Sequence, residues 1–189
     1  MRARTVRPSA TLAIATLLAA SALVAGAGPA WAPVVGQPPA PGYPPCTKVG
    51  DDGPDVIYGT NHRDVICPDE GNDVVYGRDG SDVLFGGDGV DRLYGGKGKD
   101  EFHAWRGNDK LFGEGGDDSV NGEIGNDLVV GGPGADVLIG AEGGDCLVAT
   151  DGQPNDDLKG NQGYDRYEAD PGDNVRSVNE QAADCWPNG

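Results

Sequence analysis

An apolar residue returns at every ninth position over half of the chain. Cut into nines from Gly50, the sequence gives eleven units without a gap, ending at Val148. Residues seven to nine of each unit, such as "VLF" or "RLY", predict a short β-strand around an apolar eighth residue. Alternation along a strand turns the eighth residue to one face and the seventh and ninth to the other. The eighth positions are Ile57, Ile66, Val75, Leu84, Leu93, Phe102, Leu111, Val120, Val129, Leu138 and Leu147.

Residues one to six of each unit are polar and rich in glycine, which is typical of turns. Glycine stands at the fourth position of every unit except the second, where His62 stands. Glycine reaches the positive φ angles that tight loops need. Repeated turn-and-strand units stack as a solenoid of parallel strands, and the eighth residues then form one continuous interior. The pattern therefore predicts an all-β fold built from nonapeptide repeats.

The sixth position of every unit is an aspartate. Stacked coils would bring these carboxylates to about 5 Å from their counterparts, where like charges repel. A cation between the turns removes that repulsion, and calcium suits it because it takes six to eight oxygens from carboxylates and backbone carbonyls. We therefore expect each turn to present half of a calcium site. The expected metal ligands are Asp55, Asp64, Asp73, Asp82, Asp91, Asp100, Asp109, Asp118, Asp127, Asp136 and Asp145.

The overall charge of the 189-residue chain agrees with cations as partners. There are 14 Lys and Arg against 31 Asp and Glu, a formal net charge of −17, which argues against binding to nucleic acid or to anionic membranes. A glycine-rich acidic chain can simply be disordered. A disordered chain, however, would not hold three positions in phase over eleven units, so the repeat favours a folded array.

The N-terminal residues 1–32 have the pattern of a secretory signal peptide. Three arginines precede the apolar run "TLAIATLLAASALVAGA", which is too short and wrongly flanked for a stable membrane span. Cleavage is expected after Ala27 or after Ala32. Residues 33–45, "PVVGQPPAPGYPP", predict a proline-rich extended linker. The sequence thus predicts an exported protein with a calcium-binding array over residues 46–148.

Four cysteines remain after such a cleavage. An even count in an exported chain indicates two disulfides, with three possible connectivities. The simplest pairs neighbours, Cys46 with Cys67 and Cys146 with Cys185, and staples each end of the array. Zinc binding is the competing interpretation, but no CxxC motif or paired histidines support it.

The repeat fades over residues 149–189, which predict a degenerate C-terminal cap. A two-residue insertion puts Asp156 in the acid position, and the unit after it supplies Asp165. Terminal units of repeat proteins are commonly atypical because they close the core. Tyr164, Tyr167 and Trp186 are expected to cover the open end of the core.

The nonamers resemble the RTX, or haemolysin-type, calcium-binding repeat GGxGxDxUx. The resemblance covers residues 50–148 closely and residues 149–177 weakly. It implies a parallel β-roll in which two nonamers make one coil, with calcium held between stacked turns by the sixth-position aspartates and by carbonyls of the first four loop positions. One edge would hold Asp55, Asp73, Asp91, Asp109, Asp127 and Asp145, and the other Asp64, Asp82, Asp100, Asp118 and Asp136, giving up to nine sites.

Some residues depart from the repeat pattern. His62, in a glycine position, is strained if its φ is positive, and Pro68 opens the third turn. Lys97, Lys99 and Arg106 place positive charge near Asp100 and Asp109. Weaker calcium sites are expected in these turns. The resemblance reaches the repeat alone and does not extend to the toxins or proteases in which such repeats occur.

No catalytic motif accompanies the repeat. HExxH and GxSxG do not occur, and the only histidines are His62 and His103. His103 is expected at an outward strand position in contact with solvent, and Trp105 is expected to pack locally in a loop. Paired carboxylates belong to a regular ladder, which disfavours glycosidase chemistry. We therefore predict a secreted bacterial calcium-binding protein, without catalysis, whose folding is coupled to Ca²⁺.

A binding module is the alternative prediction. Tyr58, Tyr76, Tyr94 and Phe112 recur every eighteen residues at the outward ninth position. On one sheet face they would form an aromatic ladder able to hold an extracellular glycan or a protein partner. The same ladder could serve cross-strand packing alone.

Overall fold

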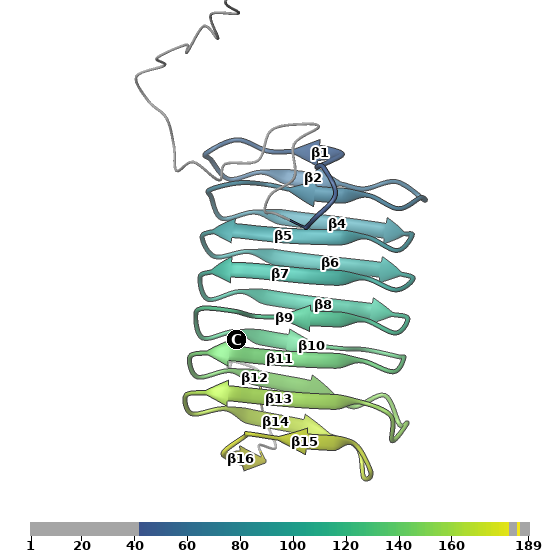
Figure 1. Ribbon diagram of the computed structural model, residues 1–189, viewed down its shortest axis with the longest axis vertical. Coiled ribbons are helices and arrows are strands. Elements are labelled where there is room, and N and C mark those ends of the chain that lie inside the picture. The colour runs from purple at the N-terminus through teal and green to yellow at the C-terminus, as the bar shows by residue number, and fades with distance from the viewer. Residues whose placement is uncertain (1–41, 182–184, 186–189) are drawn as a thin grey trace, which may run out of the picture. The chain divides into compact units, whose positions relative to one another are not determined.

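A computed structural model describes residues 42–181 and Cys185, so the predicted signal peptide and most of the predicted linker lie outside the described residues. Within this range the chain forms two parallel sheets of eight strands each (Figure 1). None of the described segments is a helix long and apolar enough to cross a membrane. The first sheet contains β1 (Lys48–Val49), β3 (Val65–Cys67), β5 (Val83–Asp88), β7 (Glu101–Arg106), β9 (Ser119–Asn121), β11 (Val137–Glu142), β13 (Asp157–Gln162) and β15 (Asn174–Arg176). The second contains β2 (Val56–Tyr58), β4 (Val74–Asp79), β6 (Arg92–Lys97), β8 (Lys110–Gly115), β10 (Leu128–Val130), β12 (Cys146–Ala149), β14 (Arg166–Ala169) and β16 (Glu180–Gln181).

Successive strands alternate between the two sheets, so each coil contains two nonamers. Leu93 of β6 pairs with Leu111 of β8, eighteen residues later, and Leu84 of β5 pairs with Phe102 of β7 in the same way. The strands are stacked one coil above the next, with the turns along the two edges of the roll (Figure 1). The prediction of an all-β parallel roll is confirmed.

The core lies between the two sheets and consists mainly of the eighth residues. From Ile66 to Leu147 every one of them is fully buried, together with Ala104, Ala149 and Leu158. Each buried aliphatic side chain contributes about 1.5–3 kcal/mol. Ile57, in the first coil, is only partly buried because no earlier coil of the second sheet covers β2. The inward direction of the eighth position is therefore as predicted.

Several strands are longer than the three residues expected from the apolar stretch. β4, β5, β6, β7 and β8 each continue through positions one to three of the following unit. The assignment of all six polar positions to the turn was therefore wrong, and Trp105 lies in β7 instead of in a loop. These residues stay in the sheet because their backbone groups still pair with the neighbouring coil, as Arg78 does with Gly96.

Both predicted disulfides are present, and each joins the outer face of a sheet to a terminal segment. Cys46–Cys67 lies in an outer cluster with Val65, Val83 and Phe85. Cys146–Cys185 lies in a second outer cluster with Leu128 and Val148. The neighbour pairing of the four cysteines is confirmed, and each disulfide holds chain against an outward sheet face.

His103 points outward as expected, but it is not fully solvated. Tyr43 lies across it, with ring centroids 4.9 Å apart, and the Tyr43 hydroxyl is 3.1 Å from His103 Nε2. Glu101 and Glu123 accept hydrogen bonds from the ring. Burial lowers the pKa of His103, but hydrogen bonds to Glu123 and Glu101 outweigh it and raise the pKa. The expectation of a solvated histidine was wrong because the segment before β1 covers this part of the sheet.

The C-terminal end of the core is closed only partly as predicted. Tyr167 packs against the core cluster, as do Val175 and Val178. Tyr164 is 61% exposed and is not part of the core cluster, because it occupies a turn position and not a strand position. Trp186 lies outside the described residues.

Candidate metal centre

The sixth-position aspartates form a hydrogen-bonded ladder along each edge of the roll. The backbone N–H of each aspartate donates to Oδ1 of the aspartate eighteen residues later, as Asp91 does to Asp109 and Asp100 does to Asp118, both at 2.8 Å. All nine such pairs among the eleven predicted ligands form this bond, at 2.7–2.9 Å. The structure therefore places the predicted residues on two edges, in the order given by the repeat.

The second carboxylate oxygen of most of these aspartates has no partner. For nine of the eleven, Oδ2 is buried and accepts no hydrogen bond from the described residues. The side chains themselves are no more than 3% exposed. A buried carboxylate oxygen without a donor is costly unless a cation or a proton accompanies it. These nine are Asp73, Asp82, Asp91, Asp100, Asp109, Asp118, Asp127, Asp136 and Asp145.

A glycine at position one lies beside this oxygen in seven of the nine turns, whereas Pro68 and Ala104 stand at position one before Asp73 and Asp109. A methyl group added to Gly113 would lie 2.5 Å from Asp118 Oδ2 and 2.5 Å from the carbonyl oxygen of Gly131, in the next coil. At Gly95 the corresponding distances, to Asp100 Oδ2 and the Gly113 carbonyl, are 2.5 and 2.7 Å. At Gly95 and Gly113 a carboxylate and a carbonyl oxygen of neighbouring coils thus converge where an added side chain would collide with them. Two converging acceptors without a donor are suited to a hard cation.

The glycine at position four holds the turn itself. Gly107 has φ +154°, and an added methyl group would collide with the carbonyl oxygen of Gly89 in the preceding coil. The backbones of stacked turns therefore approach each other too closely for any other residue. Close approach brings the loop carbonyls of one coil within reach of the next.

Burial raises the pKa of the unpaired aspartates above the ordinary value of 3.8. Desolvation is the largest cause throughout, and neighbouring acids add to it for most of them; the hydrogen bond from the preceding aspartate opposes it. The pKa of Asp100 is raised in the same direction. The raised values are about 6 for Asp73, Asp82, Asp136 and Asp145, about 7 for Asp91, Asp109 and Asp118, and about 8 for Asp127.

The first aspartate of each edge differs from the others. Asp55 Oδ2 accepts a hydrogen bond from Asp51 N–H at 2.8 Å. Asp64 Oδ2 accepts from the N–H and the hydroxyl of Thr60. Burial raises the pKa of Asp64, but bonds from Thr60 and Thr47 outweigh it, and the pKa is lowered. Protein donors therefore already occupy these two carboxylates, so they fit a cation less well than the other nine.

His62 takes no part in a strained turn. Its φ is not positive, and its N–H bonds to the Thr60 hydroxyl at 3.2 Å. The second turn adopts this alternative shape because the residue after Gly59 is a threonine that hydrogen-bonds locally. The expected backbone strain at His62 is absent.

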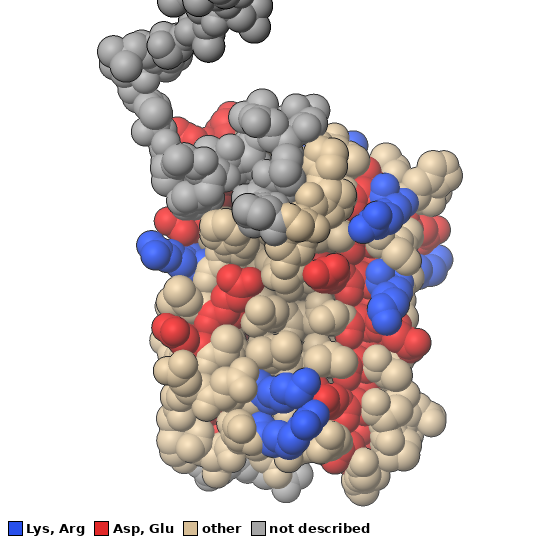
Figure 2. All heavy atoms as spheres, viewed as in Figure 1, with Lys and Arg blue, Asp and Glu red and all other residues tan. Residues whose placement is uncertain are grey.

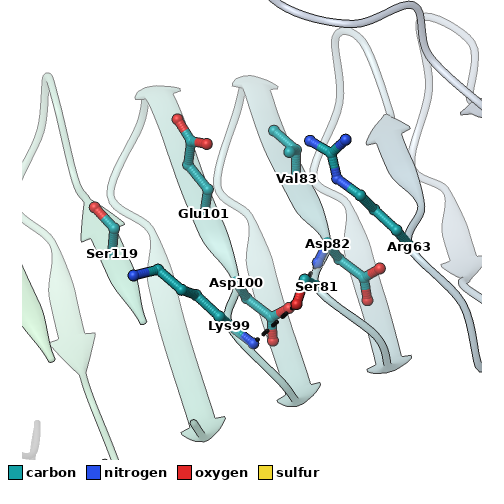
Figure 3. Close-up of a pocket in the computed structure, with 8 residues that line it drawn as sticks. All are labelled: Arg63, Ser81, Asp82, Val83, Lys99, Asp100, Glu101 and Ser119. Carbon is teal, nitrogen blue, oxygen red and sulfur yellow. Dashed lines mark hydrogen bonds between the residues drawn. The ribbon is translucent and has the colours of Figure 1, made fainter. Parts of the chain in front are cut away.

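Basic side chains near the edges point away from the buried carboxylates. Figure 3 shows a surface pocket beside Asp82 and Asp100, with the Lys99 amine and the Arg63 guanidinium directed away from both acids. Lys97 forms an exposed ion pair with Asp79, at 3.5 Å. On the face seen in Figure 2, acidic side chains form a column near the right-hand edge of the roll. Within the described part of the chain, these three basic side chains therefore form no ion pair with a ladder aspartate, although the burial that raises the pKa of Asp82 is opposed in part by Arg63.

Side chains alone do not make a metal centre. Across residues 42–181 and Cys185, no three His, Cys, Asp or Glu side chains converge on one point. A cation between turns would need backbone carbonyls as well as carboxylates, and calcium is the common ion that accepts both, with six to eight oxygens. The donor set of the turns fits calcium and, lacking clustered nitrogen and sulfur ligands, does not fit zinc.

The predicted aromatic ladder is present on the outer face of the second sheet. Tyr58, Tyr76, Tyr94 and Phe112 stack with centroids 4.9–5.0 Å apart and planes within 8°. The Arg78 guanidinium lies 5.1 Å from the centroid of the Tyr58 ring. Neighbouring rings thus cover each other's faces, and no sugar ring fits between them.

Two aspartates beyond the eleven units share the features of the ladder. Asp156 Oδ1 accepts from Asp136 N–H at 2.8 Å, and Asp165 Oδ1 accepts from Asp145 N–H at 3.0 Å. Both Oδ2 atoms are buried and unpaired. The sequence placed both acids in the degenerate region, and they were not included among the predicted ligands. Each lies twenty residues after its ladder partner, instead of eighteen, because of the two-residue insertion.

Comparison with known proteins agrees with this geometry. Six overlapping matches to the model of the RTX calcium-binding nonapeptide repeat (4 copies) together span residues 49–154, more than half of the chain. No curated protein and no solved structure matches the chain. The match covers the turns that carry the nine unpaired aspartates from Asp73 to Asp145. The chain belongs to the RTX calcium-binding nonapeptide repeat family.

Proposed function

We propose that this protein is a secreted calcium-binding β-roll whose folding is coupled to Ca²⁺. The observation that carries the proposal is the row of buried carboxylate oxygens without hydrogen-bond donors along both edges. The proposed ligands are the eleven sixth-position aspartates, of which Asp55 and Asp64 are the weakest candidates, together with loop carbonyls. Bound calcium would supply the positive charge that the turns lack.

The coupling follows from the energetics of the turns. A single nonamer buries one apolar side chain, which contributes about 1.5–3 kcal/mol, while ordering nine backbone residues costs roughly 9–18 kcal/mol. Backbone hydrogen bonds offset part of this cost. Stacking buried, unpaired carboxylates adds a further cost in each coil. Calcium at a concentration one hundred times its dissociation constant stabilises the folded state by about 2.7 kcal/mol for each site. Adjacent sites share strands, so binding should be cooperative.

Export of the protein is part of the proposal. The basic and apolar N-terminus supports a signal peptide cleaved after Ala27 or Ala32, and the two disulfides are compatible with an oxidising compartment. Extracellular calcium modules typically bind in the range of about 10⁻⁴–10⁻³ M. The chain would then stay unfolded where calcium is scarce and fold outside a bacterial cell. We propose no catalytic role, since its family consists of structural calcium-binding repeats.

Circular dichroism of the oxidised mature chain tests the coupling. We expect a disordered spectrum in chelator and a sheet spectrum in millimolar Ca²⁺, with a sigmoidal titration. Magnesium at the same concentration should not replace calcium, because it demands octahedral geometry and dehydrates reluctantly. Replacing Asp73, Asp91 and Asp109 together by Asn should abolish the calcium response of the edge they share.

A matched control separates loss of ligands from loss of charge. Asp52, Asp79 and Asp157 lie outside the ladder, and replacing all three by Asn removes the same charge. This variant should titrate like the wild type. A sheet spectrum that chelator leaves unchanged would contradict the coupling, and an unaltered titration of the ladder variant would contradict the ligand assignment.

The stacked rings favour a packing role for the aromatic ladder over glycan binding. Sugars bind to open aromatic faces, whereas these rings cover one another at about 5 Å along the sheet. The ladder therefore supports cross-strand stabilisation of the second sheet.

A further inference from the structure

Asp165 lies beyond the residues that match the repeat family, yet it is as enclosed as any acid of its edge. It is 0% exposed, and its Oδ2 is buried without a partner. Its Oδ1 accepts the N–H of Asp145, so its side chain is fixed in the orientation of the ladder. An oriented, buried carboxylate oxygen without a donor needs a positive partner.

A second oxygen faces this carboxylate from the closing coil. A methyl group added to Gly160 would come closer than 3.0 Å to both Asp165 Oδ2 and the Ser177 carbonyl oxygen. This is the arrangement seen at Gly113, where the second oxygen belongs to a glycine at position one of the next coil. Here the same geometry is produced by a serine.

The closing coil reaches this geometry by a different route. The ladder partner of Asp165 is Asn179, fourteen residues later instead of eighteen, and Asn179 Oδ1 accepts Asp165 N–H at 2.7 Å. Ser177 has φ +53°, a left-handed conformation that is uncommon outside glycine. A shortened coil with a left-handed serine thus aims a carbonyl at the position where the regular repeat aims a glycine carbonyl.

We propose that Asp165 and the Ser177 carbonyl form part of an additional calcium site that closes the C-terminal end of the roll. The inference rests on the proposed function of the regular turns and extends it to a coil without the repeat motif. Apolar packing is weak here: Tyr167, Val175 and Val178 are only partly buried. The cap therefore depends on the cation for order, and Asn179 takes the place of the next acid in the ladder.

Hydrogen exchange of the full oxidised mature chain, read by mass spectrometry over residues 160–179, tests this site. In the wild type, calcium should protect these amides at least tenfold relative to chelator. Asp165→Asn keeps an oxygen for the Asp145 N–H but puts an amide where Oδ2 stood. It should bind one calcium ion fewer in equilibrium dialysis and lose the protection of 160–179, while residues 50–145 remain protected. Asp157→Asn, an outward acid of the same segment paired with Lys159 and Arg176, should behave like the wild type.

The possible failures are distinct. If the wild type binds no calcium, the proposed function falls. If residues 50–145 respond to calcium but residues 160–179 are equally protected in chelator, the additional site is refuted, whether or not the variant folds. An Asp165→Asn protein that binds as many ions as the wild type refutes it as well.

Discussion

The substitution Asp127→Asn should have opposite effects on stability with and without calcium. Asp127 is 3% exposed, and its Oδ1 accepts Asp109 N–H at 2.8 Å, a bond that the asparagine oxygen can keep. Burial raises the pKa of Asp127 to about 8, and nearby acids add to the rise. An asparagine amide would instead point a donor toward the Gly140 carbonyl, which lies beside Asp127 Oδ2.

The size of the effect follows from the raised pKa. In the calcium-free roll at pH 7, Asp127 must hold a proton that the unfolded chain, with a pKa of 3.8, has released. Taking up this proton costs about 1.4 kcal/mol for each pH unit above 3.8, or about 4 kcal/mol at pH 7. Asparagine avoids this cost, so the variant should be more stable than the wild type in chelator by up to about 4 kcal/mol. In saturating calcium it loses a ligand and should be less stable by at least about 2.7 kcal/mol.

Urea unfolding followed by circular dichroism measures both effects on the oxidised protein. If the wild type is unfolded in chelator, a fixed concentration of a stabilising osmolyte brings both proteins into range. Asp79→Asn, which removes an exposed charge, is the control and should shift neither curve by more than about 0.5 kcal/mol. Destabilisation of Asp127→Asn by the same amount in chelator and in calcium would refute the reasoning, because the carboxylate would then act only through packing.

Three further predictions follow from the same geometry. Gly113→Ala should remove one bound calcium and lower the unfolding free energy in calcium by at least about 2 kcal/mol, since the new methyl group enters the gap between two oxygens. At Gly115 the nearest atom to an added methyl group is 3.8 Å away, so Gly115→Ala should be tolerated. Equilibrium dialysis distinguishes the two variants by the number of calcium ions that they bind. Tyr76→Ser should lower the unfolding free energy by about 1–3 kcal/mol and leave the number of bound calcium ions unchanged, because the ring only stacks on its neighbours; a lost ion in dialysis would contradict this. The raised aspartate pKa values mean that the calcium-free roll binds more protons than the unfolded chain, so its stability should fall as pH rises from about 4 to about 8. The calcium affinity should rise over the same pH range. Dialysis at pH 5 and pH 8 measures this affinity, and equal values would count against buried aspartate ligands.

The regular part of the fold could be predicted because each position has one dominant role. The eighth residues alternate with outward neighbours, and this alone identifies the core from Ile66 to Leu147. The eleven sixth-position acids lie on two edges as predicted, since a period of nine with two units per coil places them there, whereas Asp156 and Asp165 were left out of the predicted ligands. The resemblance assigned carbonyls of the first four loop positions to the site, but the steric role of the position-one glycines lies in an approach between coils that sequence does not show.

The departures from prediction arise where non-repeating segments meet the roll. Tyr43 covers His103, which the outward pattern placed in solvent. Thr60 supplies donors to Asp64, an acid that the repeat treats like every other. The closing carbonyl of Ser177 depends on a coil shortened by four residues. Each difference comes from a contact made by one particular residue, and such a contact is not part of the repeating pattern.

In the proposed calcium-binding roll, close contacts at most of the first positions leave no room for a fixed neutralising charge. The stacked coils repeat the negative charge of the aspartate in every turn. A basic side chain that neutralised this charge would therefore have to occur in every turn as well. A lysine or arginine at position one would need a Cβ where Asp118 Oδ2 and the Gly131 carbonyl already converge. Basic side chains therefore remain outside the turns, as Lys99 and Arg63 do in Figure 3. At the glycine positions, the close approach that gathers oxygens for the proposed cation thus excludes a cationic side chain, so the proposed calcium-bound roll would take its positive charge from ions in solution.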